Sequence, residues 1–515
     1  MIEKLWFLTP ELVLFAAAVI VSVTGLSRSR GTRDLSPLIV ILALMVAAIL
    51  TPVVYGHRER LEGAGYLIPL MGQSVKIMVC LIGALLATLS VGLLDRNLER
   101  AIASGRTPFD AIRMSRGEYY AFFLLSLIGV MLVSSANDLI WLFLALELTS
   151  LPTYVMVAIA RSRRISQEAA VKYFFLGAMS AAIFLFGFAF IYGATGTIVL
   201  TEIAAAFRDD VNTTGSISLL GLVGILLALL GLCFKIAAAP MHFYAADVYE
   251  GAASPVTAFL GFVPKTAGIV AIMLLLAAVG YTEHSSGIAT LPAQLTAALF
   301  MIAVLTMTLG NVLALLQKSV KRVLAYSSIA HSGYLLIGII AGPEMGFGAA
   351  LFYLFIYGIM NTAAFAVLAA LEKRGQEIDT FDDLAGLGRK HPLLTAAFAI
   401  ASLSLLGFPP LLGFVGKFSL FAAGIDAGQI LLVVIACFNS AISAWYYLKL
   451  AGIPILSAPA PQSEMVQPGP SIWPAVGAVI AAIALVTLWL FADPIATATH
   501  DAFAGLNTAA RVASP

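Results

Sequence analysis

The chain has 515 residues, of which 61% are hydrophobic and only 11% are charged, and its mean hydropathy is +0.98. Soluble globular domains carry roughly 25% charged residues, so this composition excludes an ordinary soluble protein and predicts an all-α polytopic membrane protein. The formal net charge is +1 and no basic tract is present, so we expect no nucleic-acid partner.

The motifs of a cofactor site are missing from the sequence. Its three cysteines, Cys80, Cys233 and Cys437, lie far apart in apolar stretches, which fits neither a zinc nor an iron–sulfur ligand pattern. No GxGxxG follows a strand and no P-loop is present, so we expect neither a dinucleotide site nor an ATP site. We therefore expect no cofactor and no metal in this chain.

Apolar runs of about 20 residues predict about fourteen transmembrane helices. The predicted helices cover about 5–26, 36–55, 72–94, 118–135, 138–160, 168–192, 216–240, 255–279, 294–316, 322–341, 346–371, 392–423, 428–450 and 473–491. The seventh runs into Pro240 and the twelfth contains Pro409 and Pro410, so we expect both helices to be broken. Broken backbone at membrane depth needs protein or a water-filled cavity around it and is typical of transport sites.

Three charged residues lie inside otherwise apolar predicted helices: Glu147 in the fifth, Lys235 in the seventh and Lys265 in the eighth. A charge in hydrocarbon is costly, so each is a functional candidate. The simpler alternative is a structural acid paired with a neighbouring base or hydroxyl for Glu147, and a lysine that snorkels to an interface for Lys235. Lysine, unlike arginine, can release a proton in a membrane interior. Pro264 frees the carbonyl of Leu260, which we expect to accept a hydrogen bond from Lys265. An acid followed by two bases suggests a route for a cation.

The second half of the chain repeats this arrangement. Glu147 and Lys235 are 88 residues apart, His331 and Lys417 are 86 apart, and each series ends at a proline-broken helix. The offset of five helices is odd, so the pattern predicts two inverted five-helix repeats, helices 4–8 and 9–13. Lys235 precedes its break whereas Lys417 follows its own, a difference that the pattern does not explain.

Other polar residues surround these candidates. His331 has neighbouring hydroxyls on its own helix and can relay protons near neutrality, although a purely hydrogen-bonded histidine is an equal alternative. Lys172 lies near a helix end, and His242 and Asp247 belong to the break of the seventh helix, where they can line a water path. We expect at most a supporting role for these last three residues.

Lysine and arginine in the loops predict the orientation. Loops after odd-numbered helices carry 18 of them, and the opposite side, termini included, carries 5. The positive-inside rule then places both termini in the periplasm. We divide the chain into residues 1–117 (three helices and a cytoplasmic loop), 118–280 (first repeat), 281–452 (second repeat) and 453–515 (linker and last helix). The proline- and serine-rich stretch 451–472 is expected to be a linker without stable fold.

Five stretches carry a family resemblance: LELTSLPTYVMVA, QEAAVKYFFLGA, PMHFYAADVYEGAASPVTAFLGFVPKTAG, KRVLAYSSIAHSGY and LAGLGRKHPLLTAAFAIASLSLLGFPPLLGFVGKF. In this combination the chain resembles the antiporter-like membrane subunits of bacterial respiratory complex I, the proton-translocating NADH:quinone oxidoreductase. The stretches span about residues 118–425. Lys417 makes subunit N the most similar branch, because subunit M usually has a glutamate at that position.

The resemblance implies a proton path through Glu147, Lys235, Lys265, His331 and Lys417. It implies a translocase subunit without a redox site, in a bacterial plasma (inner) membrane, with FMN, iron–sulfur clusters, NADH and quinone bound by partner subunits. The implied partners are the other membrane subunits of complex I, neighbouring antiporter-like subunits among them, and membrane lipid. Two alternatives stay open: a subunit of an Mrp-type cation/proton antiporter, and a non-conducting scaffold, which would have no need for five buried titratable residues.

Overall fold

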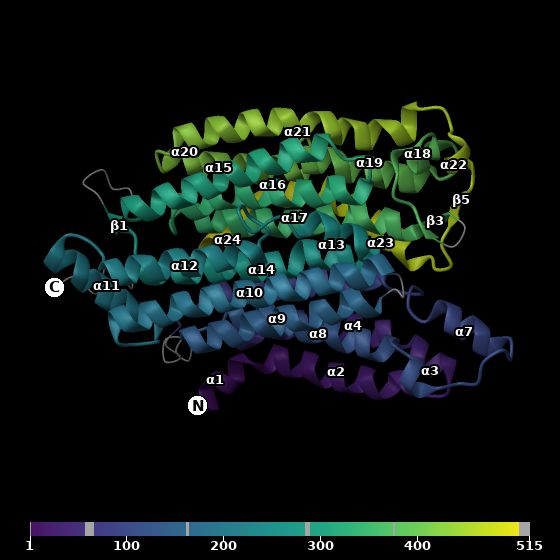
Figure 1. The fold of residues 1–515 in the computed structure, drawn as a ribbon, viewed down its shortest axis with the longest axis horizontal. Coiled ribbons are helices and arrows are strands. Elements are labelled where there is room, and N and C mark those ends of the chain that lie inside the picture. Colours follow the sequence, from purple (N-terminus) through teal and green to yellow (C-terminus); the bar gives the residue numbers. More distant parts are fainter. Residues whose placement is uncertain (1, 57–65, 161–163, 284–288, 374–375, 504–515) are drawn as a thin grey trace.

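A computed structural model describes residues 2–56, 66–160, 164–283, 289–373 and 376–503 as a bundle of helices that run along one long axis (Figure 1). Within these ranges, eleven helices are long and apolar enough to cross a membrane, and three shorter apolar helices accompany them. The predicted helical membrane fold is therefore confirmed. Helices occur at all fourteen predicted segments, whereas the inverted repeat stays a prediction.

The elements of the first half are helical apart from one short hairpin at its end. They are α1 (Ile2–Phe7), α2 (Thr9–Gly25), α3 (Arg30–Asp34), α4 (Ser36–Tyr55), α6 (Met71–Leu89), α7 (Arg96–Ala103), η1 (Ala111–Arg113), α8 (Arg116–Val133), α9 (Leu139–Ile159), α10 (Arg164–Thr195), α11 (Leu200–Thr214), α12 (Leu219–Lys235), α13 (Ala245–Gly251), α14 (Ser254–Val279), β1 (Thr282–Glu283) and β2 (Ala289–Thr290).

The second half adds a small sheet to its helices. Its elements are α15 (Ala293–Leu315), α16 (Val320–Ala341), α17 (Gly346–Ala370), β3 (Leu371–Lys373), β4 (Gln376–Glu377), α18 (Phe381–Leu384), η2 (Leu387–Arg389), α19 (Pro392–Leu406), α20 (Leu412–Asp426), α21 (Ile430–Leu456), α22 (Pro461–Glu464), β5 (Val466–Pro468), α23 (Trp473–Thr487), η3 (Leu488–Phe491) and α24 (Ala492–Asp501).

Both predicted helix breaks are present. The seventh segment is divided between α12 and α13, and Pro240 lies in the interruption. The twelfth is divided between α19 and α20, with Pro409 and Pro410 in the interruption. Proline removes a backbone donor and clashes with the preceding turn, which explains why the two apolar runs stop at these points.

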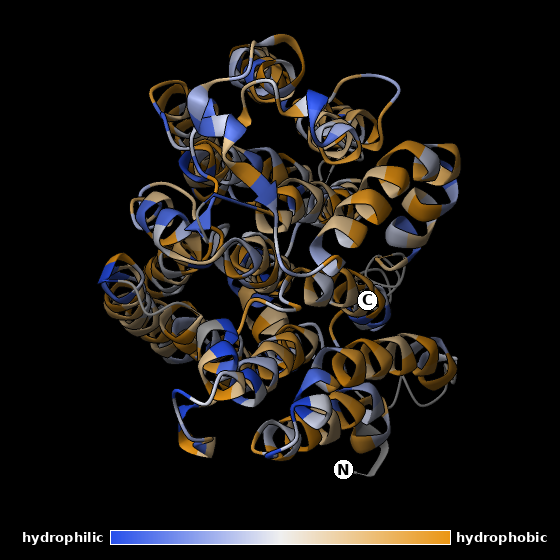
Figure 2. Cartoon of the chain, turned by 90° about the vertical axis from the view of Figure 1, so that its right-hand side faces the viewer, coloured by the Kyte–Doolittle hydropathy of each residue, from blue (hydrophilic) through white to orange (hydrophobic). Residues whose placement is uncertain are grey.

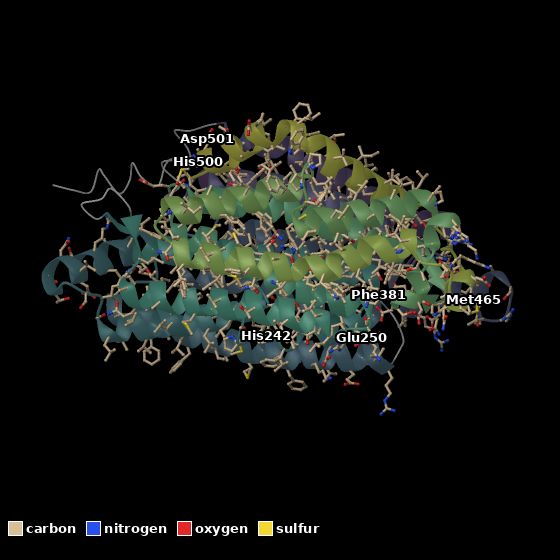
Figure 3. All side chains as sticks on the ribbon, turned by 90° about the horizontal axis from the view of Figure 1, so that it is seen from above. His242, Glu250, Phe381, Met465, His500 and Asp501 are labelled. Carbon is tan, nitrogen blue, oxygen red and sulfur yellow. The ribbon has the colours of Figure 1, made fainter. Side chains whose placement is uncertain are left out.

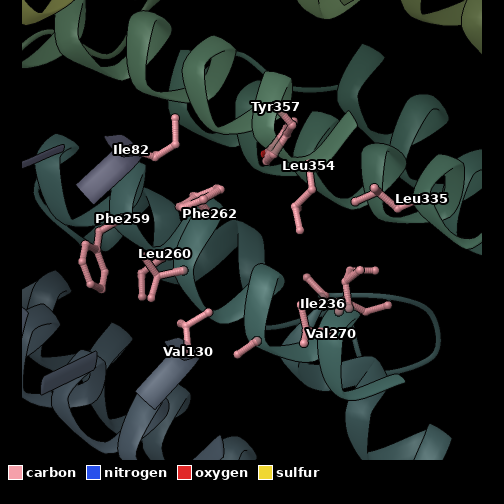
Figure 4. Close-up of a cluster of buried hydrophobic side chains, with 14 of the residues drawn as sticks. Ile82, Val130, Ile236, Phe259, Leu260, Phe262, Val270, Leu335, Leu354 and Tyr357 are labelled. Atoms are coloured by element: carbon pink, nitrogen blue, oxygen red, sulfur yellow. The ribbon is translucent and has the colours of Figure 1, made fainter. Parts of the chain in front are cut away.

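Helix α14 forms the centre of the bundle. Every residue from Ser254 to Val279 is buried, as expected for a helix that is hydrophobic on all sides. Phe259, Phe262 and Val270 of this helix belong to the buried cluster that Figure 4 shows. Lys265 thus lies in the interior of the protein, enclosed by other helices.

The two ends of the bundle differ. Figure 1 shows α1 at one end and α7, β3 and β5 at the other, and Figure 3 shows His500 and Asp501 near the end that carries α1. Both described ends of the chain thus lie at one end of the bundle. Six of the basic loop and terminal residues counted above lie outside the described residues: Arg58, Arg60, Arg161, Arg163, Arg374 and Arg511.

The expectation of an unstructured linker over 451–472 is wrong. Helix α21 continues to Leu456, and β5 pairs with β3 in a three-stranded antiparallel sheet of order β4-β3-β5. The stretch is held by backbone hydrogen bonds to a distant strand, which its local composition does not reveal. Figure 2 views the molecule from this end and shows hydrophilic ribbon in its loops and strands, in front of hydrophobic helices.

Candidate functional site

Glu147 and Lys235 form an ion pair between α9 and α12. Lys235 Nζ lies 2.8 Å from Glu147 Oε1 and donates a second hydrogen bond to Ser150 Oγ at 2.7 Å. The lysine side chain is only 2% exposed and the glutamate 17%. Lys235 is the last residue of α12, where the carbonyl end of a helix favours a cation. The break thus positions a buried base in direct contact with a partly buried acid.

Two serines of α16 connect this break to Lys265. Ser332 Oγ donates to the carbonyl of Ile236, the first residue after α12, and lies 3.3 Å from the carbonyl oxygen of Ser328. Lys265 Nζ donates to the carbonyl and hydroxyl oxygens of Ser328, at 2.5 and 2.7 Å. A nearly continuous set of hydrogen bonds therefore runs from the α12 break to Lys265.

The expected acceptor for Lys265, the carbonyl of Leu260, is wrong, because the ammonium bonds to Ser328 of another helix. Residues five apart on a helix point roughly 140° away from each other. Lysine is also long enough to reach across to α16. The acceptor is therefore set by helix packing rather than by Pro264.

His331 is held between two tyrosines. Its Nδ1 lies 2.6 Å from the Tyr353 hydroxyl and its Nε2 lies 2.9 Å from the Tyr447 hydroxyl. The Tyr447 hydroxyl also hydrogen-bonds Ser327 Oγ. These partners come from α17 and α21 rather than from the neighbouring hydroxyls of α16. They are 22 and 116 residues away in sequence, so no local spacing could have identified them.

Lys417 reaches back across the second break. Its Nζ donates to the carbonyl of Leu406, the last residue of α19, at 2.8 Å and lies 3.4 Å from Ser440 Oγ. Gly407 leaves room for the lysine stem, because a Cβ there would lie 3.0 Å from Lys417 Cδ. Both ammonium groups thus lie at the carbonyl end that precedes a break. This resolves the apparent mismatch between Lys235 and Lys417.

Lys172 and Asp247 lie apart from these buried residues. Lys172 Nζ contacts Glu168 at 2.8 Å and Asp247 at 3.1 Å, and Asp247 also pairs with Arg322 at 2.9 Å. The Lys172 and Asp247 side chains are each 43% exposed. His242 lies between α12 and α13, and its buried Nδ1 has no hydrogen-bond partner among the described residues. Figure 3 labels it near one flank of the bundle.

A second buried ion pair, Glu11 with Lys76, was missed by the sequence analysis. Lys76 Nζ lies 2.7 Å from Glu11 Oε1 and donates to the carbonyl of Phe7 at 2.7 Å. Lys76 is fully buried and the Glu11 side chain is 5% exposed. A lysine within the apolar run MGQSVKIMVC carries the same signal as Lys235, so the pair could have been found.

The arrangement around the two breaks combines carboxylate, ammonium, hydroxyl and imidazole groups in a buried space. Hydroxyl and imidazole groups both donate and accept hydrogen bonds, and a carboxylate can gain a proton that an ammonium loses, so a proton can pass between these groups where water or small rotations close the gaps. Among the described residues no group of three or more His, Cys, Asp or Glu could hold a metal ion. The groups around the two breaks are suited to proton transfer.

Comparison with known proteins points the same way. A family model described as "NADH:quinone oxidoreductase/Mrp antiporter, TM" matches residues 136–443. NADH-quinone oxidoreductase subunit N of Trichlorobacter lovleyi is 44% identical over 339 residues, which are 65% of this chain and 67% of that protein.

Solved structures share the fold. A chain of respiratory complex I from Thermus thermophilus, solved with bound aureothin, matches 95% of this chain and 99% of its own length at 30% identity and a TM-score of 0.73. A chain of the Mrp complex from Dietzia sp. matches 98% of both chains at 22% identity and a TM-score of 0.77, a likeness of fold alone. The resemblance stated from the sequence is confirmed.

Proposed function

The chain belongs to the subunit N branch of the NADH:quinone oxidoreductase and Mrp antiporter family, and from this membership we propose that it moves protons across the membrane as a subunit of an NADH:quinone oxidoreductase. The proton path would comprise Glu147, Lys235, Lys265, His331 and Lys417. The driving redox chemistry would take place in partner subunits that bind NADH, FMN, iron–sulfur clusters and quinone. Lys172, His242 and Asp247 would support the path from the α13 side.

The observation that carries this proposal is the Glu147–Lys235 pair at the end of α12. Its buried ammonium bonds both a carboxylate and a hydroxyl, at 2.8 and 2.7 Å, next to backbone that a helix break has opened. A transient proton on Glu147 would weaken the pair and change the protonation of Lys235. Interacting groups of this kind titrate as a coupled set, so one protonation event can pass along the series.

We also propose the orientation that the positive-inside rule gives, with α7 and β3 in the cytoplasm. Cysteines at Ser104 and Thr213, both exposed and at opposite ends, test it in a background where the exposed Cys437 is serine. An impermeant thiol reagent should label T213C in intact cells and S104C only after lysis. The reverse labelling pattern would show that the topology is inverted.

We also keep the division of the chain into 1–117, 118–280, 281–452 and 453–515 as part of this proposal.

Purification from native membranes tests the assignment as a whole. We expect co-purification with flavin and iron–sulfur subunits and with other antiporter-like subunits, and NADH:quinone reductase activity in the same fraction. Co-purification with small antiporter subunits and no flavin would instead support the Mrp-type alternative. A normal proton-to-electron ratio after loss of the charge at Glu147 would support a non-conducting scaffold.

A further inference from the structure

A pocket of about 60 Å³ lies at the end of the bundle that carries α7, β3 and β5. Its lining comes from the end of α6, the start of α14, the end of α17, the strands β3 and β4, and the segment after β5. Roughly 10–15 Å³ of such space holds one water molecule, so the pocket has room for several. Two carboxylates, Glu372 and Glu377, belong to the lining.

The two carboxylates have different partners. Arg96 binds both oxygens of Glu372, at 2.5 and 3.1 Å, and thereby holds the pKa of Glu372 below its usual range. Glu377 instead accepts hydrogen bonds from Lys321 Nζ at 2.7 Å and from the hydroxyl of Ser254 at 2.6 Å. The Glu377 carboxylate thus lies between the pocket and the first residue of α14.

From this point a polar stripe runs inward along α14. Thr257, Gly261 and Lys265 are spaced four residues apart, so they share one face of the helix and end at the buried lysine. The Thr257 hydroxyl donates to the carbonyl of Tyr249 at 3.1 Å. At Gly261 the missing side chain leaves space for the Asn361 amide, which a Cβ would approach to 2.6 Å. Each turn of this face therefore meets a polar group.

Helix α16 completes the connection. Ser328 lies seven residues after Lys321 and hence on the same face of α16, two turns deeper in the bundle. Its hydroxyl lies 3.3 Å from the Tyr249 hydroxyl and 2.7 Å from Lys265 Nζ. Lys321 is 3% exposed and Glu377 is 9% exposed, so the pair closes the outer end of this connection.

We propose that Glu377 takes up protons from the pocket and that these protons reach Lys265 past the Ser254 and Thr257 hydroxyls and then the Tyr249 and Ser328 hydroxyls, with water bridging the gaps. The inference rests on the proposed function and assigns its uptake side. The Glu377 carboxylate gains a proton from water in the pocket, and the resulting acid releases that proton to its hydrogen-bond partner, the Ser254 hydroxyl, which passes its own proton on through bridging water. The neutral amine of Lys265 takes it up as an ammonium, and Glu377 returns to its ionised form.

The test uses the assembled complex in vesicles, with Glu377→Gln as the variant and Glu99→Gln as its matched control. Glutamine keeps an oxygen for Ser254 but cannot take up a proton. Glu99 is a buried carboxylate at the same end of the bundle, paired with Arg33 at 2.8 Å, and it does not line the pocket. NADH:ferricyanide reductase activity, which needs no proton translocation, measures the amount of assembled complex.

We expect E377Q to lower the pumping-coupled NADH:quinone rate by about tenfold or more, since a positioned proton-transferring side chain contributes roughly 100-fold or more to such a step. Its solvent isotope effect in D2O should rise, because proton uptake becomes limiting, and E377D should restore the rate in part. E99Q should change neither the NADH:quinone rate nor the isotope effect. A merely structural role for Glu377 would lower assembly and leave the isotope effect unchanged.

A normal rate and isotope effect in E377Q, alongside failure of pumping in E147Q, would overturn this inference and leave the proposed function standing. Normal pumping in both variants would overturn the proposed function as well. If E377Q does not assemble, Thr257→Val decides the question, because it removes one buried hydroxyl of the series and keeps the side-chain shape. A normal rate in T257V would then overturn the inference, and a raised isotope effect would support it.

Discussion

Two glutamate–lysine ion pairs that join helices of the bundle have nearly the same geometry. Lys235 lies 2.8 Å from Glu147, and Lys76 lies 2.7 Å from Glu11. Both lysines are almost fully buried, and both face an aromatic ring, Phe184 at 5.5 Å in one case and Tyr55 at 5.2 Å in the other. By composition and distance alone the two pairs are equivalent.

Their surroundings are different. Lys235 ends a broken helix and bonds the Ser150 hydroxyl, and the next residue, Ile236, accepts from Ser332 on the way to Lys265. Lys76 lies within the unbroken helix α6, and its further acceptor is the backbone of Phe7. Around it, Phe7, Val54 and Tyr55 form a small apolar cluster.

The comparison teaches that a buried ion pair is not by itself a transport site. A charge that moves needs neighbours that can accept it, and Lys235 has a serine hydroxyl and broken backbone beside it, whereas Lys76 lies within an unbroken helix. We therefore expect the two pairs to respond differently to the same substitutions.

The largest effect is expected for Glu147→Gln. The variant keeps the shape of the side chain and loses the acid, so proton pumping should fall by about 100-fold, the order that a positioned proton-transferring group contributes. The proton-to-electron ratio and the rate are measured in reconstituted vesicles, with Glu11→Gln as the matched variant of the other pair. An unchanged ratio and rate in E147Q would make both pairs structural.

Lys235→Arg should be nearly as damaging. Arginine stays charged in proteins, with a pKa above about 12, so it can hold Glu147 ionised but cannot release a proton. If Lys235 takes up and releases a proton in each cycle, K235R should fail about as badly as K235A. Lys76→Arg controls for the larger guanidinium in a buried pair. An assembled K235R complex that pumps near the wild-type rate would leave Lys235 as a fixed charge.

Ser332→Ala should have an intermediate effect. It removes the hydroxyl between Ile236 and Ser328, and a hydrogen bond of about 1 kcal/mol corresponds to roughly fivefold in rate. Ser180→Ala is the control, because Ser180 Oγ is equally buried and donates to the Gly231 carbonyl of α12 at 2.7 Å, away from the connection to Lys265. Equal losses of rate in S332A and S180A would show that side-chain packing, rather than the Ser332 hydroxyl between Ile236 and Ser328, determines the rate.

The sequence predicted the membrane fold and both helix breaks, because each has a local cause. Apolar runs give helices, and prolines end them. The contact partners of His331 and Lys265 could not be predicted in this way. Tyr353, Tyr447 and Ser328 become their neighbours only through the packing of α16 against other helices.

Contacts between distant parts of the chain also explain why the order of the stretch 451–472 could not be predicted. Its composition favours a linker, yet β5 is held by pairing with β3, about a hundred residues earlier in the chain. The mismatch between Lys235 and Lys417 also disappears only in three dimensions, since the side chain of Lys417 crosses its break to reach Leu406. Lys76 is a different case, because a lysine inside an apolar run can be recognised from the sequence alone.

The smallest effect on pumping is expected at the Glu11–Lys76 pair. Its lysine lies inside an apolar run, as Lys235 does, but not at a helix break. Glu11→Gln and Lys76→Met each leave one buried charge alone, which costs about 3–5 kcal/mol of stability. The double variant removes both charges and should recover most of that loss, because replacing a whole buried pair by neutral groups is often nearly neutral. Thermal inactivation of the purified complex measures these differences. Per assembled complex, all three variants should keep the wild-type proton-to-electron ratio, since Lys76 lies within the unbroken helix α6 rather than at a helix break. A lowered ratio in E11Q would mean that the Glu11–Lys76 pair also carries protons, and that burial next to a counter-charge suffices without a broken helix.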